Sequence, residues 1–136
     1  MKVMLIIFLL LVSFRVFAPT YPCLYAPESE PINPYRGLIY GIGMVECKLD
    51  TLAVNPIEGA YGYFQIRAIR LEDYRKRTGI NYSLSDMLDY RKAERVFMYY
   101  ATRIGYRDPG KIARDWNGSG PKTWEYWKKV RKHLVI

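Results

Sequence analysis

The sequence predicts a mainly α-helical fold in a single domain. Apolar residues recur at steps of three and four along several segments, which is the spacing that places them on one face of a helix. No segment of any length alternates apolar and polar residues as a half-buried strand does. The 136 residues are enough for one domain with a single core. We therefore expect a helical domain with little or no β structure.

The first helix is predicted over residues 35–48. Leu38, Ile42 and Val45 share a narrow arc of this helix, and Glu46 falls on the edge of that arc. Burial at such a margin removes water from a carboxylate, which raises the pKa of the group and keeps it protonated near neutral pH. Glu46 is therefore a candidate general acid. The alternative is a glutamate that points to solvent or pairs with an arginine.

The middle of the chain carries turn signals followed by a helix. Residues 50–58 form a polar connection that contains Asn55-Pro56. Gly59, Ala60 and Gly62 then allow a tight turn that brings the backbone close to its neighbours. We expect a helix over residues 64–77 that closes at Thr78-Gly79.

Three more helices are predicted in the second half. Ser83 to Asp86 is a capping-box pattern that begins a short turn, and Asp89 is expected to cap the helix that follows. Asp108-Pro109 begins a short helix, and Thr123 is expected to cap the last one after the break at residues 118–121. The apolar faces of these helices are expected to carry Ala93, Val96, Phe97, Tyr100 and Ile104, then Ile112 and Ala113, then Trp124, Trp127 and Val130.

Residues 1–18 are predicted to be a signal peptide or an N-terminal membrane anchor. Lys2 precedes a short apolar run, as in a secretory signal, and the run is too short for a comfortable membrane span. Ala18 suits a cleavage site but Pro19 does not, so cleavage and retention as an anchor both stay open. Residues 19–33 are proline-rich and indicate a linker, followed by the folded domain over residues 34–136. We expect the protein to be exported to the periplasm or cell envelope.

Charge and composition narrow the class of partner. The formal net charge of +8 favours polyanions, which include nucleic acid, anionic lipid surfaces and wall polymers. Thirteen tyrosines suit a groove that binds sugars, although many of them are equally suited to the core. Cys23 and Cys47 are compatible with one disulfide in an oxidising compartment, but the sequence does not show that they pair. Cys47 is more easily explained as a small buried residue than as a nucleophile.

Four short motifs follow one another at characteristic separations. They are Glu46-Cys47, Asn55-Pro56, Gly59-Ala60-Tyr61-Gly62-Tyr63-Phe64-Gln65 and Asp115-Trp116-Asn117-Gly118. With these motifs the chain resembles the soluble lytic transglycosylase family of the lysozyme-like superfamily, over residues 35–134. Members of that family have a glutamate at a helix end, then Asn-Pro, a Gly-Ala-x-Gly-Leu-Met-Gln turn and an Ala-Tyr-Asn-x-Gly stretch. The resemblance implies a single lysozyme-like helical domain.

The resemblance also implies an activity. The family cleaves the β-1,4 bond between N-acetylmuramic acid and N-acetylglucosamine in peptidoglycan and leaves a 1,6-anhydro end. Glu46 would serve as the single acid and base, an exception to the usual pair of carboxylates. Gln65 and Asn117 would hold N-acetyl and hydroxyl groups, and no metal or organic cofactor is expected. The implied partners are peptidoglycan glycan strands, and a secretion, conjugation or phage assembly apparatus is a further candidate.

Aromatic residues are expected to complete the sugar groove. The resemblance assigns its walls to Tyr61, Tyr63 and Trp116. Two positions depart from the family pattern, because Cys47 replaces a serine that steadies the acid and Trp116 replaces a tyrosine. The phenol that is lost with that tyrosine is expected from Tyr99 or Tyr100.

Three alternative functions stay open. The first is a hydrolysing muramidase of the same fold, in which Asp50, Glu58 or Asp115 activates water. The second is a cell-wall-binding protein without catalysis. The third is nucleic-acid binding through the basic C-terminal helix, which we disfavour because its tryptophans match one amphipathic face and because the chain carries an export signal.

Overall fold

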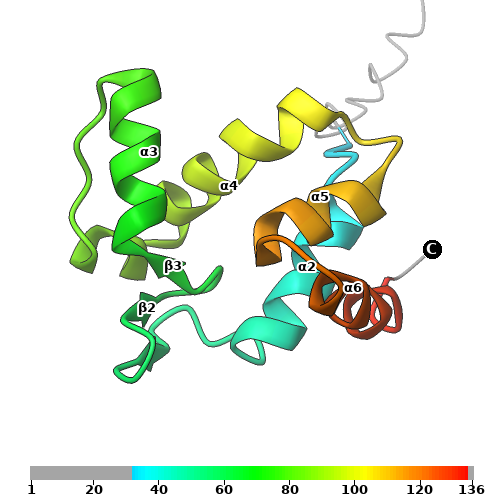
Figure 1. Cartoon of the computed structure of the whole chain (residues 1–136). Helices are drawn as coiled ribbons and strands as arrows, with labels where there is room; N and C mark the ends of the chain where they lie inside the picture. The colour runs from blue at the N-terminus through cyan, green and yellow to red at the C-terminus, as the bar shows by residue number, and fades with distance from the viewer. Residues whose placement is uncertain (1–31, 135–136) are drawn as a thin grey trace, which may run out of the picture. The chain divides into compact units, whose positions relative to one another are not determined.

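The computed structural model of the chain describes residues 32–134. The predicted signal peptide or anchor and the predicted linker up to residue 31 lie outside the described residues. Asn33–Ile136 forms one compact unit, and its elements are shown in Figure 1. The unit is mainly helical, as the sequence predicts, and adds a small three-stranded sheet. None of its described helices has both the length and the apolar character that crossing a membrane requires.

The first half of the unit contains two helices and the sheet. Helix α2 spans Arg36–Glu46, close to its predicted bounds, and α3 spans Ala68–Thr78. Between them lie β1 (Val54–Asn55), β2 (Ala60–Tyr61) and β3 (Ile66–Arg67), which pair antiparallel in that order. Because each strand has two residues, none is long enough to show an alternating pattern in the sequence.

The prediction of a helix over residues 64–77 is wrong at its start. Gln65 has a φ of 48°, in the left-handed region, and Ile66 pairs with Tyr61 across the sheet. Helix α3 therefore begins only at Ala68. Its end is as predicted, because Gly79 has a φ of 77° and its amide donates to the carbonyl of Arg75.

The second half contains the remaining helices. The 3₁₀ helix η1 spans Ser85–Leu88, and α4 spans Tyr90–Ile104. As predicted, the side chain of Asp89 caps α4 by accepting from the amides of Arg91 and Lys92. Helix α5 spans Pro109–Asn117 with its proline in the first turn, and α6 spans Lys122–Arg131.

The predicted cap and buried face of α6 are both corrected. Pro121 occupies the cap position and Thr123 lies inside the helix, where its hydroxyl donates to the carbonyl of Gly120. Its buried face consists of Thr123, Tyr126 and Val130, so Val130 of the predicted face is buried, and Trp127 is only partly buried against the core. Trp124 is 55% exposed and packs against the guanidinium of Arg114 instead of entering the core.

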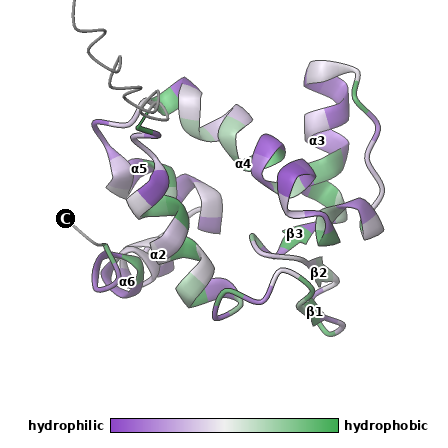
Figure 2. Cartoon of the chain, turned by 180° about the vertical axis from the view of Figure 1, so that it is seen from behind, coloured by the Kyte–Doolittle hydropathy of each residue, from purple (hydrophilic) through white to green (hydrophobic). Residues whose placement is uncertain are grey.

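The helices form two groups joined by α4. Helices α2, α5 and α6 pack together, while the sheet lies beside η1 and α3, and α4 contacts both η1 and α5 (Figure 1). Hydrophobic and hydrophilic residues alternate along the helices, as expected where one face is buried (Figure 2). An aromatic cluster links the groups. Phe64 stacks on Phe97 with ring centroids 4.7 Å apart, and Trp116 meets Phe97 edge-on at 5.1 Å.

A glycine is required where the tight turn meets η1. Gly62 has a φ of 73°, and a Cβ atom there would collide with the main-chain carbonyl oxygen of Met87. Gly59, in the same turn, also has a positive φ, but a Cβ atom there would meet no atom within 4 Å. Substitutions at the two glycines can therefore separate the energetic cost of the left-handed backbone from the cost of the collision with Met87.

We expect Gly62→Ala to lower the free energy of unfolding by about 2–5 kcal/mol, from the left-handed backbone and the collision together. Gly59→Ala is the matched control and is expected to cost about 1–2 kcal/mol, from the backbone alone. Urea denaturation of both variants measures the difference. Equal losses would show that the contact with Met87 adjusts without cost.

Candidate active site

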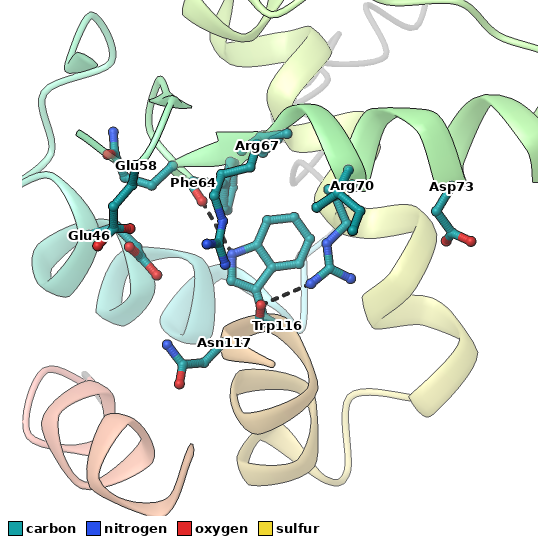
Figure 3. A pocket seen from close by; sticks show the side chains of 11 residues that line it. Glu46, Glu58, Phe64, Arg67, Arg70, Asp73, Trp116 and Asn117 are labelled. Atoms are coloured by element: carbon teal, nitrogen blue, oxygen red, sulfur yellow. Dashed lines mark hydrogen bonds between the residues drawn. The ribbon is translucent and has the colours of Figure 1, made fainter. Parts of the chain in front are cut away.

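A cavity of about 320 Å³ lies where the end of α2, the sheet, α3 and the end of α5 meet. Figure 3 shows the side chains that line it. Four of the predicted site residues lie in this one cavity: Glu46, Gln65, Trp116 and Asn117. The complete lining is Glu46, Glu58, Phe64, Gln65, Ile66, Arg67, Ile69, Arg70, Asp73, Trp116 and Asn117.

Glu46 is the last residue of α2, and its carboxyl group is mostly withdrawn from water. Burial raises its pKa, and this is the largest effect on the group. The hydroxyl of Tyr126 donates to Oε1 over 2.6 Å and lowers the pKa, the charge of Glu58 raises it, and the charge of Arg67 lowers it. The net result is a raised pKa, so Glu46 holds its proton to a higher pH than an exposed glutamate does.

The chain after Glu46 reverses sharply and joins the helix end to the tight turn. Lys48 and Leu49 have φ values of 53° and 70°, which end α2. The thiol of Cys47 donates to the carbonyls of Gly43 and Tyr63, over 3.4 and 3.3 Å. Cys47 thus connects α2 to the turn and makes no recorded hydrogen bond to the acid, in line with the expected effect of replacing serine. Cys23, the other cysteine of the chain, lies outside the described residues.

Tyr63 fixes the turn against α2. Its hydroxyl donates to the carbonyl of Ile39 over 3.2 Å, and the side chain is 7% exposed. The ring lies so close to α2 that a Cβ atom on Gly43 would collide with it. Tyr63 is therefore a packing residue that sets the distance between the helix carrying Glu46 and the turn carrying Gln65.

Gln65 is held by its own turn. Its Nε2 donates to the carbonyls of Gly62 and Ala53, over 2.9 and 3.3 Å. Both hydrogen bonds use the amide nitrogen, so the side-chain oxygen is the acceptor that Gln65 offers to a ligand in the cavity. The left-handed backbone at this residue costs about 1–3 kcal/mol, a strain that is common at functional sites.

Trp116 and Asn117 are placed by the end of α5. The indole Nε1 of Trp116 donates to the carbonyl of Phe64 over 3.3 Å, which ties α5 to the tight turn. Arg70 of α3 donates to the carbonyl of Trp116 over 2.9 Å (Figure 3). Its guanidinium also lies over the rings of Trp116 and Tyr100. Arg70 therefore joins α3 to the last turn of α5, where Asn117 faces the cavity.

Three residues predicted to shape the groove lie elsewhere. Tyr63 packs against α2, and Tyr61 lies half-buried in β2 against the core. Tyr99 packs edge-on against Tyr74 at 5.2 Å, and its buried hydroxyl has no hydrogen-bond partner among the described residues. Tyr100 donates to Asp73 Oδ2 over 2.8 Å and does not line this cavity.

The structure brings other side chains to the site that the sequence did not single out. Tyr126 supplies the phenol beside Glu46 and lies 80 residues away in the sequence. Arg67, Arg70 and Asp73 line the cavity from the end of β3 and the exposed side of α3. Tyr126 lies four residues before Val130 in the predicted last helix and therefore shares its buried face, which is the sequence signal that was missed.

The three candidate second carboxylates are separated by their positions. Glu58 lines the cavity, but Asp50 and Asp115 do not. Asp50 accepts from the amide of Leu52, and Asp115 pairs with Lys111. Over residues 32–134, no three His, Cys, Asp or Glu side chains gather as metal ligands would.

Comparison of the chain with protein-family models, curated proteins and solved structures found no match. The function is therefore inferred from the residues of this cavity.

We expect Tyr126→Phe to raise the pKa of Glu46 further, because the lost hydrogen bond stabilises the carboxylate form. A carbon-13 NMR titration of the Glu46 carboxyl measures the shift. Tyr40→Phe, on the exposed side of the same helix, is the control and should leave that titration unchanged. An unchanged or lowered pKa in Tyr126→Phe would contradict the assigned hydrogen bond.

Proposed function

We propose that this protein is a peptidoglycan lytic transglycosylase with a lysozyme-like fold and that Glu46 is its single catalytic acid and base. The observation that carries the proposal is the cavity itself. A carboxyl group whose pKa is raised by burial shares it with Gln65, Trp116 and Asn117, which come from separate segments of the chain. These are the residues in which the sequence resembles the family.

The chemistry needs one group that first gives and then takes a proton. Glu46 protonates the glycosidic oxygen as the bond from that oxygen to C1 of N-acetylmuramic acid breaks. The resulting carboxylate takes the proton of the 6-hydroxyl while its oxygen bonds to C1 and closes the 1,6-anhydro ring. Glu46 is protonated again and no water is consumed. The Tyr126 hydroxyl stabilises the carboxylate between the two steps through its hydrogen bond to Oε1.

The remaining predicted contacts are refined by the structure. The Gln65 oxygen accepts from an N-acetyl N–H or a sugar hydroxyl, and the Asn117 carboxamide can both donate and accept. Trp116 is 8% exposed and its Nε1 is already bonded to Phe64, so it forms a wall of the cavity rather than an open stacking surface.

The setting in the cell is part of the proposal. A net charge of +8 favours attraction to the anionic polymers of a bacterial wall. Export through residues 1–18, with cleavage or retention as a tether, would bring the domain to peptidoglycan. A secretion, conjugation or phage assembly partner fits the same setting.

A hydrolysing muramidase is the second candidate because of Glu58. This residue lines the same cavity as Glu46 and its charge raises the pKa of the acid. Water activation requires a second carboxylate in the same cavity as the acid, and Glu58 would be that group. In that reaction a water oxygen, rather than the 6-hydroxyl oxygen, bonds to C1.

We expect Glu46→Gln to lower the rate of peptidoglycan cleavage by about 10²–10⁴-fold, because the proton donor is lost. Muropeptides released from purified peptidoglycan are measured by mass spectrometry, and wild type should release 1,6-anhydro ends. Glu125→Gln, at an exposed pair with Lys128 on α6, is the control and should keep full activity. Unchanged activity in Glu46→Gln would end the catalytic assignment, and inactive wild type that binds the wall would favour the non-catalytic alternative.

The two reaction types are separated by Glu58→Gln. For a transglycosylase we expect the rate to stay within a few-fold of wild type, because no second carboxylate takes part. A hydrolase would lose about as much as Glu46→Gln and would release reducing ends instead of anhydro ends. The same muropeptide analysis gives both results.

A further inference from the structure

Most polar groups that line the cavity have a hydrogen-bond or ion-pair partner, and Arg67 differs from them in this respect. Glu46 binds Tyr126, Gln65 binds its turn, Arg70 binds the carbonyl of Trp116, and Asp73 binds Arg77. The Arg67 guanidinium has no recorded hydrogen bond or ion pair among residues 32–134. Figure 3 shows its side chain reaching into the space between Glu46 and Trp116. A cation thus faces the cavity without a partner from the described chain.

The backbone of Arg67 is fixed while its side chain stays exposed. The residue ends β3, where it pairs with Ala60, and its extended backbone (φ −105°, ψ 160°) leads directly into α3. Its neighbour Ile66 is 1% exposed, and side chains alternate along a strand, so Arg67 projects away from the core. The fold therefore fixes the point from which the Arg67 side chain leaves the sheet and the side of the sheet to which it projects.

We infer that Arg67 binds a carboxylate of the substrate, so that the site prefers an anionic glycan to a neutral one. The planar guanidinium presents paired N–H donors that match the two oxygens of a carboxylate. The inference rests on the proposed function and adds a specificity-determining residue to it. No residue of the family motifs occupies this position in the resemblance described above.

The other charged groups of the cavity are compatible with this role. Glu58 lines the cavity but makes no ion pair with Arg67 among the described residues, so it does not neutralise the guanidinium by contact. The charge of Arg67 lowers the pKa of Glu46, and a bound carboxylate would offset that effect. Binding of an anionic substrate would then help to keep the acid protonated for the first step.

Peptidoglycan carries carboxylates in two places. In intact strands the lactyl carboxyl of N-acetylmuramic acid is tied up in an amide, and free carboxylates belong to the stem peptide. Strands stripped of peptide by an amidase expose the lactyl carboxylate instead. The two preparations therefore distinguish the source of the group that Arg67 binds.

The test compares wild type with Arg67→Gln and Arg67→Lys on four substrates: intact strands, stripped strands, the same strands with amidated carboxyls, and neutral chitin oligosaccharides. We expect Arg67→Gln to raise KM by about 10- to 100-fold for the strands that carry the bound carboxylate, with kcat changed much less. These are the intact strands if the group belongs to the stem peptide and the stripped strands if it is the lactyl carboxylate. Arg67→Lys should recover part of the loss because it keeps the charge but not the paired donors. On amidated strands and on chitin, the KM of the variants should match that of wild type, because these substrates offer Arg67 no carboxylate.

The matched control is Arg75→Gln, which removes the same charge from an exposed site on α3 outside the cavity. An equal rise of KM in that variant, or no rise in Arg67→Gln, would overturn the inference. A wild type that cleaves amidated and free strands equally well would overturn it too.

Binding measurements keep the inference separate from the proposed function. The single variant Glu46→Gln is compared with the double variant that also carries Arg67→Gln. Calorimetric titration of each with the intact and the stripped strands reports affinity without turnover. If wild type cleaves no substrate but the affinity still falls with Arg67→Gln, the proposed function fails and the carboxylate site stands. If the two affinities are equal, the carboxylate site fails whether or not cleavage is seen.

Discussion

The site depends on one turn, residues 62–65, which is held from three sides. Gly62 lies against the backbone of Met87, Tyr63 packs under α2, and Phe64 stacks on Phe97 of α4. Gln65 then turns to the cavity with a strained backbone. Because the neighbouring residues are fixed by packing, this strain is sustained and the carboxamide keeps a defined direction. The same turn accepts a hydrogen bond from Trp116, so it also positions the end of α5.

Much of the helical framework could be predicted from the sequence. Where the prediction was wrong, there is a physical cause. Helices α2, α4 and α5 have clear apolar spacing, and Asp89 caps α4 as predicted. The sheet was not predicted because two-residue strands carry no periodicity, and their pairing depends on contacts across the turn. The start of α6 was misplaced because Thr123 has the right chemistry for a cap but bonds back to Gly120 from inside the helix.

Some residues of the candidate site were predicted from the sequence and others were not. Glu46, Gln65, Trp116 and Asn117 were predicted from short motifs, and the structure places all four in one cavity. Tyr61, Tyr63 and Tyr99 were expected there, but an aromatic side chain serves the core as readily as a groove, and local sequence does not separate the two uses. Tyr126 and Arg70 were missed because their roles arise from contacts with distant segments, Glu46 in one case and the end of α5 in the other.

The contact between Tyr126 and Glu46 has a consequence for the assembly of the site. The two residues lie 80 positions apart, and α6 is the element that brings the phenol to the acid. The segment from α2 to α5 contains the acid, the glutamine turn and the tryptophan wall. It still lacks the donor that stabilises the carboxylate. Docking of α6 against α2 therefore completes the site, because it gives the acid its hydrogen-bond donor.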